Sequence, residues 1–188
     1  MKTWIAAAGL LAILVFAVCR RAAPESAADL AQAAAARHHA HEYAQAVELY
    51  QRSLALHPDP LVRANLARAL AADQEFRAAA EQYQLLLKDE PQNGALWHDY
   101  GLVLESGLKD LQGAEDALFN ATKFPPRLPE ASYDLGRVLL QHGRYEEAGA
   151  CFDAAISQAP RNASWLEDAQ AQQVQAYLLA KKQPPPPR

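Results

Sequence analysis

Glycine and cysteine are scarce in this chain, and the sequence patterns of the common enzyme sites are missing from it. The 188 residues include 8 glycines and 2 cysteines. Neither glycine-rich phosphate loop, G-x-x-x-x-G-K or G-x-G-x-x-G, occurs, and G-x-S-x-G and H-E-x-x-H are also missing. Cys19 and Cys151 are not at the spacing of a metal-binding pair, and they imply no disulfide framework. The sequence therefore predicts a protein that is not an enzyme and that has no cofactor.

Positive charge is in short supply after the first 21 residues. The chain has 18 Lys and Arg against 22 Asp and Glu, and three of the basic residues, Lys2, Arg20 and Arg21, lie in that first segment. Binding to nucleic acid requires clustered Lys and Arg, and the remaining sequence shows no such stripe. Nucleic acid is therefore excluded as the expected partner.

Residues 4–19 form the one long uncharged run, and it is rich in Ile, Leu, Val and Phe. Its sixteen residues lie between the length of a secretory signal core and that of a membrane-spanning helix. We expect residues 1–21 to be an N-terminal hydrophobic helix, either a signal anchor or a signal peptide, joined by a linker at 22–26 to a body exported to the bacterial periplasm. Orientation is poorly specified because basic residues flank both ends. A lipoprotein acylated at Cys19 is the main alternative, although the residues before Cys19 match that signal poorly.

A pattern of large and small residues recurs every 33 to 35 positions. The clearest copy consists of Ser132, Tyr133, Asp134, Leu135, Gly136, Leu139, Gly143, Tyr145, Ala148, Phe152, Ala155 and Pro160. The copy before it includes Trp97, Tyr100, Gly101, Leu104, Leu111, Ala114, Leu118, Ala121, Pro125 and Pro126, with one extra residue between Glu105 and Leu111. Two earlier copies are more degenerate. Such a period predicts stacked supersecondary units that bury their apolar faces against one another.

These residues resemble the tetratricopeptide repeat, whose pattern of Trp, Leu-Gly, a large residue, Ala, Phe and a closing Pro has a period of about 34. The resemblance covers 27–162 and implies an all-α, right-handed superhelical solenoid of about four helix-turn-helix repeats, at 27–59, 60–93, 94–128 and 129–162. We expect helix pairs at 27–39 with 42–56, 60–72 with 75–88, 94–106 with 111–123, and 129–141 with 144–158.

A capping helix is predicted at 163–181, and a proline-rich tail at 182–188. Ser164 and Glu167 have the spacing of a capping box at the start of this helix. Its apolar residues are expected to cover the last hairpin; they are Trp165, Ala169, Val174, Tyr177 and Leu178.

The resemblance also implies a binding groove, because the first helices of tetratricopeptide repeats commonly line a concave surface that holds a peptide or a partner helix. The positions expected to face it here are Asn65, Arg68, His98, Leu102, Glu105, Tyr133, Asp134, Arg137 and Gln141. Asn65 is the leading candidate because its amide can both donate to and accept from a peptide backbone.

The leading functional hypothesis is a scaffold or adaptor that binds a protein or peptide at the cell envelope, attached to the membrane through 4–19. One alternative is a subunit that assembles with copies of itself or within a membrane-associated complex. A minor alternative is metal handling by His38, His39 and His41, since neutral imidazoles bind transition metals. No metal site is otherwise predicted.

Overall fold

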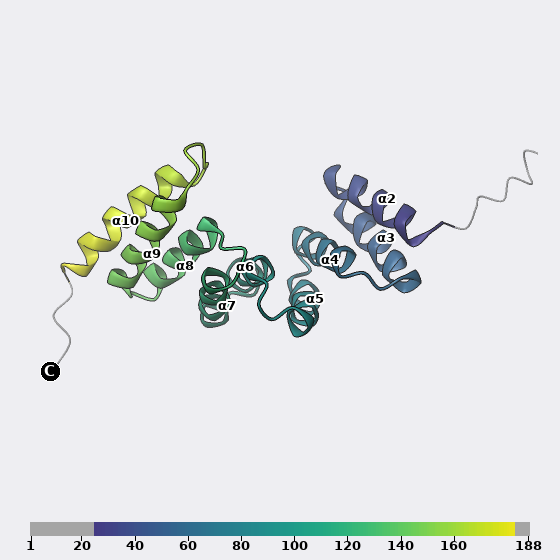
Figure 1. Ribbon diagram of the computed structural model, residues 1–188, viewed down its shortest axis with the longest axis horizontal. Coiled ribbons are helices and arrows are strands. Elements are labelled where there is room, and N and C mark those ends of the chain that lie inside the picture. The colour runs from purple at the N-terminus through teal and green to yellow at the C-terminus, as the bar shows by residue number, and fades with distance from the viewer. Residues whose placement is uncertain (1–24, 183–188) are drawn as a thin grey trace, which may run out of the picture.

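The computed structural model of the protein describes residues 25–182, which contain helices and no strands. Four helix pairs follow one another: α2 (Ala27–His39) with α3 (Tyr43–Leu56), α4 (Pro60–Ala72) with α5 (Phe76–Asp89), α6 (Gly94–Leu102) with α7 (Leu111–Lys123), and α8 (Pro129–Gln141) with α9 (Tyr145–Gln158). A last helix, α10 (Leu166–Ala180), packs on α9. Figure 1 shows the pairs succeeding one another along an open arc. The predicted all-helical solenoid of paired helices is confirmed.

The predicted hydrophobic helix at 4–19 and the proline-rich end of the chain at 183–188 lie outside the described residues. Within 25–182, every helix is too short or too polar to cross a membrane.

Local sequence explains where the helices begin. The first helices of three pairs have side-chain caps: Ser26 and Asp29 form a capping box, and Asp59 and Asn93 accept hydrogen bonds from the first amides of α4 and α6. Each second helix begins two residues after a residue with positive φ. These turn residues are His41, Gln74, Lys109 and Gly143. One left-handed residue therefore reverses the chain in every pair.

The extra residue of the third repeat is accommodated in the helix rather than in a loop. After Leu102 the backbone widens into a π-helical turn, η1 (Val103–Leu108), which ends at Lys109. Such turns absorb a single inserted residue within an otherwise regular helix. Val103, Leu104 and Glu105 remain buried as a result.

Small residues let the paired helices approach, and large ones fill the space between them. Ala114 and Ala148 are completely buried, and a Cβ atom on Gly101 would lie 2.7 Å from Leu118. The buried side chains form two clusters, one from α2 to η1 and one from η1 to α10. Trp97 and Tyr100 pack against both, so α6 joins the two halves of the core.

Two expectations about α10 are wrong. The helix starts at Leu166, with Trp165 as its N-cap and no side-chain cap, so Ser164 and Glu167 form no capping box. The Trp165 ring instead stacks on Tyr133, with 5.3 Å between ring centroids, and its Nε1 donates to Glu130 at 3.3 Å. These contacts fix the position of Trp165. Trp165, and not Ser164, is therefore the residue that directly precedes the first turn of α10.

The predicted apolar face of α10 is also rotated. Ala169 and Ala176 are buried against the last pair, whereas Val174 and Leu178 are 58% and 54% exposed. Alanines allow α10 to lie close to α9, whose Gly149 accommodates the ring of Tyr177. Close approach through small side chains therefore turns the longer aliphatic ones outward.

Candidate functional site

Five of the nine predicted groove residues form one polar network between α6, η1 and α8. Asp134 accepts hydrogen bonds from Arg137 Nη1 at 2.8 Å, and its other oxygen lies 2.9 Å from His98 Nε2. Glu105 accepts from Arg137 Nη2 at 3.0 Å and from Gln141 at 3.4 Å. The carboxylates of Glu105 and Asp134 are nearly inaccessible, with side-chain exposures of 8% and 10%. The network therefore links two successive helix pairs through buried charges.

Asn65 and Arg68 lie one step earlier in the stack, on α4. Arg68 Nε donates to Asp99 of α6 at 2.9 Å, and Arg68 Nη1 lies 3.4 Å from Asn65 Oδ1. The Asn65 side chain is half-buried, and its amide nitrogen makes no hydrogen bond to another residue of 25–182. Leu102 lies beside this group, in a pocket of about 230 Å³ that Arg68 and Asp99 also line.

Tyr133 is held at the other end of this surface by the capping helix. Its hydroxyl donates to Asp168 of α10, and the Arg137 guanidinium lies 5.8 Å from its ring centroid. Burial and the hydrogen bond to Asp168 raise the pKa of Tyr133 to about 12. The ring is therefore a neutral, oriented aromatic surface at physiological pH.

Carboxylates outnumber cations on this surface. Both arginines are paired, Arg68 with Asp99 and Arg137 with Glu105 and Asp134. Asp168 adds a further carboxylate, so the named groups carry an excess of negative charge. Within 25–182, all buried polar side-chain atoms have hydrogen-bond partners. The surface is thus preorganised, and it offers no unpaired arginine to a carboxylate ligand.

Sequence reasoning missed Asp99 and the contribution of α10. Asp99 could have been found, because it stands one period after Asn65 and one before Asp134, in the same register of its repeat. Trp165 and Asp168 could not, because α10 follows the last repeat and its rotation depends on packing.

The three histidines at the end of α2 and in the turn after it are not grouped around one centre. His41 Nδ1 lies 2.7 Å from the Tyr43 hydroxyl, and the rings of His38 and His39 are 6.3 Å apart. Burial and neighbouring positive charges lower the pKa of His38. In the described part of the chain, no three His, Cys, Asp or Glu side chains are grouped to hold a metal ion. The structure gives the metal-handling alternative no support.

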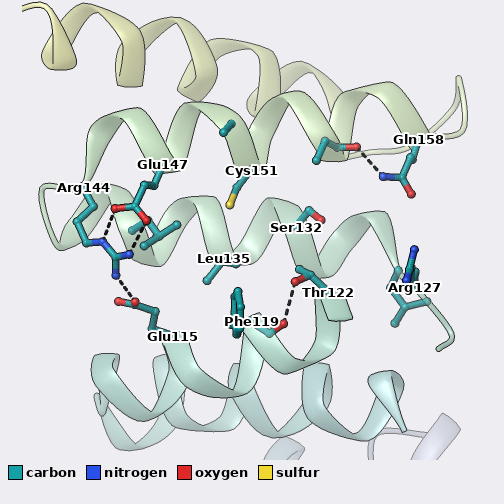
Figure 2. A pocket seen from close by; sticks show the side chains of 14 residues that line it. Glu115, Phe119, Thr122, Arg127, Ser132, Leu135, Arg144, Glu147, Cys151 and Gln158 are labelled. Atoms are coloured by element: carbon teal, nitrogen blue, oxygen red, sulfur yellow. Dashed lines mark hydrogen bonds and ion pairs between the residues drawn. The ribbon is translucent and has the colours of Figure 1, made fainter. Parts of the chain in front are cut away.

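A second hollow lies on the opposite side of α8. This outer trough, about 520 Å³ in volume, is bounded by α7, α8 and α9. Figure 2 shows Leu135 and Cys151 facing its centre, with Arg144, Glu147 and Glu115 gathered at one end. Arg127 and Gln158 lie at the other end. Burial and the charge of Glu147 raise the pKa of the Cys151 thiol to about 11, so it is a protonated, apolar part of the floor.

Comparison with known families agrees with this architecture. Two tetratricopeptide-repeat family models match the chain, at residues 64–129 and 129–162, and together they cover just over half of it. The chain belongs to the tetratricopeptide-repeat family. No curated protein matches it in sequence.

Several solved tetratricopeptide-repeat-like structures share the fold at low sequence identity. MamA from Desulfovibrio magneticus RS-1 is 18% identical, with a TM-score of 0.66 and 78% of each chain covered. YrrB, described as a TPR protein with an unusual peptide-binding site, is 22% identical, with a TM-score of 0.67 and coverage of 85% of this chain and 80% of that one. PilF from Pseudomonas aeruginosa is 18% identical, with a TM-score of 0.67 and coverage of 87% and 79%. At these identities the likeness concerns the fold alone. Tetratricopeptide-repeat proteins generally serve as protein-interaction scaffolds, and their fold is typically non-enzymatic.

Proposed function

We propose that this protein is a non-enzymatic adaptor that binds an extended segment of a partner protein across α4, α6 and α8. The observation that carries the proposal is a row of oriented polar side chains on α4, α6 and α8. It consists of two hydrogen-bonded groups, one with Asn65, Arg68 and Asp99 and one with His98, Asp134 and Arg137, with Tyr133 beside the second. Their side chains are already held by neighbours, so binding would cost little side-chain entropy. The Asn65 amide nitrogen is placed to donate to a ligand carbonyl, and the pocket beside Leu102 offers space for one side chain.

The charge of the surface indicates the kind of segment that it would bind. Two paired arginines and four carboxylates favour an uncharged or basic segment over an acidic one. A partner carboxylate would meet no unpaired cation there and would be repelled by Asp99 and Asp168. We therefore propose a basic or neutral segment with an aliphatic or aromatic anchor.

Binding to immobilised peptides of matched length tests this proposal. The set would contain extended basic, neutral and acidic sequences, each with and without a central Leu or Phe. We expect the full chain to retain basic and neutral peptides with an anchor. Asn65→Ala should weaken that binding about tenfold through the lost hydrogen bond, whereas Asn120→Ala on α7 should leave it unchanged. Preference for acidic peptides, or equal binding by the Asn65→Ala variant, would refute the proposal.

We further propose that residues 4–19 attach the body to a bacterial membrane, with the body in the periplasm. The uncharged run between Lys2 and Arg20 supports this, as does a body without nucleic-acid-binding charge. A periplasm-dependent reporter enzyme fused after Arg188 should be active, and loss of 4–19 should release the protein from membranes. An active reporter together with lipid labelling that disappears in Cys19→Ser would favour the lipoprotein alternative instead.

A further inference from the structure

The outer trough matches the exposed face of α10 in shape and charge. We infer that the protein self-associates by placing α10 of one copy in the trough between α7 and α9 of another. This contact lies on the side of α8 opposite to the proposed peptide surface, so the two proposals are independent.

The trough exists because a small residue stands where the preceding pair has an indole. Ser132 and Trp97 each lie four residues before the glycine of their repeat, Gly136 or Gly101. Trp97 packs against both core clusters, and its Nε1 donates to the Pro91 carbonyl at 2.8 Å. Ser132 leaves the equivalent position open, and it lines the trough.

The two ends of the trough differ in charge. At one end Glu115 and Glu147 share one arginine, Arg144, and Glu115 also lies 2.7 Å from His142 Nδ1. With a neutral His142 this end carries an excess of one carboxylate. At the other end Arg127 is exposed and forms no ion pair with any residue in the described range. Between them Phe119 is 55% exposed, so the trough offers an apolar middle with a positive and a negative end.

The outward face of α10 has a negative end, an apolar middle and a positive end, which complements the charge of the trough. Glu167, Val174, Leu178 and Lys181 lie on the side opposite to the buried Ala169, and all four are exposed. A helix that ends a repeat array normally presents a polar outer face to water. Two adjacent aliphatic side chains, each more than half exposed, depart from that expectation and favour a partner.

The lengths and directions of the two surfaces agree. Glu167 and Lys181 are separated by about 21 Å along the helix, and the α9 wall from Glu147 to Gln158 spans about 17 Å. When Glu167 of one copy lies near Arg127 of the other, Lys181 at the C-terminal end of the same α10 reaches Glu147 of the other copy. This orientation is antiparallel to both α7 and α9, so the helix dipoles also attract. Val174 and Leu178 then lie over the apolar middle.

A charge-swap experiment tests the assigned partners directly. Sedimentation velocity of the full chain, with residues 4–19 covered by a mild detergent, should show concentration-dependent association in buffer of low ionic strength. Arg127→Glu and Glu167→Arg should each weaken association about tenfold, and the double variant should recover most of it, because only this contact joins the two positions. Arg77→Glu on α5, also exposed, is the matched control and should have no effect.

Filling the trough and removing the apolar contacts provide a second measurement. Ser132→Trp should abolish association while the helical circular dichroism spectrum persists, since the preceding repeat has Trp97 at that place. Leu178→Ser should weaken association about tenfold, and Leu61→Ser, a change at a leucine that is 77% exposed on α4, should not. A wild-type chain that stays monomeric at about 100 μM, or association that survives both changes, would overturn the inference. Weakening by both charge variants without recovery in the double variant would overturn it as well.

Discussion

Asp134 and Glu105 show how single residues shape the surface between the helix pairs. Each is a nearly inaccessible carboxylate that accepts from Arg137, and Asp134 also contacts His98. Carboxylates buried to this extent are tolerated only when they are paired and hydrogen-bonded. Their role in this fold is therefore to hold the Arg137 guanidinium in place, which also removes that cation from ligand binding.

Replacing Asp134 should be costly because it leaves Arg137 and His98 without their shared acceptor. Asp134→Ala is expected to lower the free energy of unfolding by about 2 kcal/mol in urea titrations followed by circular dichroism. Asp153 on α9 is the control: it also accepts two side-chain hydrogen bonds, but it is exposed, so Asp153→Ala should have a smaller effect. Equal losses in the two variants would show that burial of Asp134 contributes nothing.

Cys151 should be chemically inert at neutral pH. With a thiol pKa of about 11, only about one molecule in a thousand carries the thiolate at pH 8. In a Cys19→Ser background, iodoacetamide should react about two orders of magnitude more slowly with the folded than with the urea-unfolded protein. Because the unfolded thiol ionises near pH 8.5, the contribution of this group to stability should fall as pH rises from about 8.5 toward 11. Equal reaction rates in both states would contradict the assigned environment.

At the scale of the elements, the four turns within the pairs use the same backbone geometry with different residues. Positive φ occurs at His41, Gln74, Lys109 and Gly143, and only the last is the residue that adopts it without steric cost. Lys109→Gly should raise the free energy of unfolding by about 0.5 to 1 kcal/mol, and Gly143→Ala should lower it by a similar amount. Thermal denaturation of the two variants checks both signs. A loss of stability in Lys109→Gly would mean that its side chain contributes more than the strain costs.

The helices could be predicted from the sequence almost residue by residue, because proline, glycine and the buried alanines recur with the repeat. The π-helical form of η1 could not: the extra residue was visible, but whether a loop or a helix absorbs it depends on packing of Leu104 and Glu105. Five of the residues predicted to line the groove lie in contact with one another, because one period places them on successive first helices. The rotation of α10 lay beyond sequence reasoning, since nothing repeats after Asn162.

The whole molecule is a linear array whose two core clusters meet at Trp97 and Tyr100. In such arrays stability is approximately a sum of unit and interface contributions, so a weakened interface can separate the halves. In a Trp4→Phe background, Trp97→Ala should convert one urea transition into two, seen as non-coincident curves from Trp165 fluorescence and circular dichroism. Phe119→Ala, which truncates an exposed ring on α7, should keep a single transition. Coincident curves for Trp97→Ala would show that the other contacts of α6 suffice.

The π-helical turn η1 also has a consequence for how such a chain could lengthen or be rebuilt. Because the surplus residue is taken up within one turn, α7 and everything after it keep their phase relative to the earlier units. Beyond Leu108, counting in steps of 34 residues therefore arrives one residue too early in each repeat. The positions of the side chains in space still match those of the earlier units. Moving a whole helix pair from one side of this turn to the other should therefore succeed when the chain is cut at the loops between pairs. Cuts chosen by counting 34 residues should instead turn the buried faces of the helices outward.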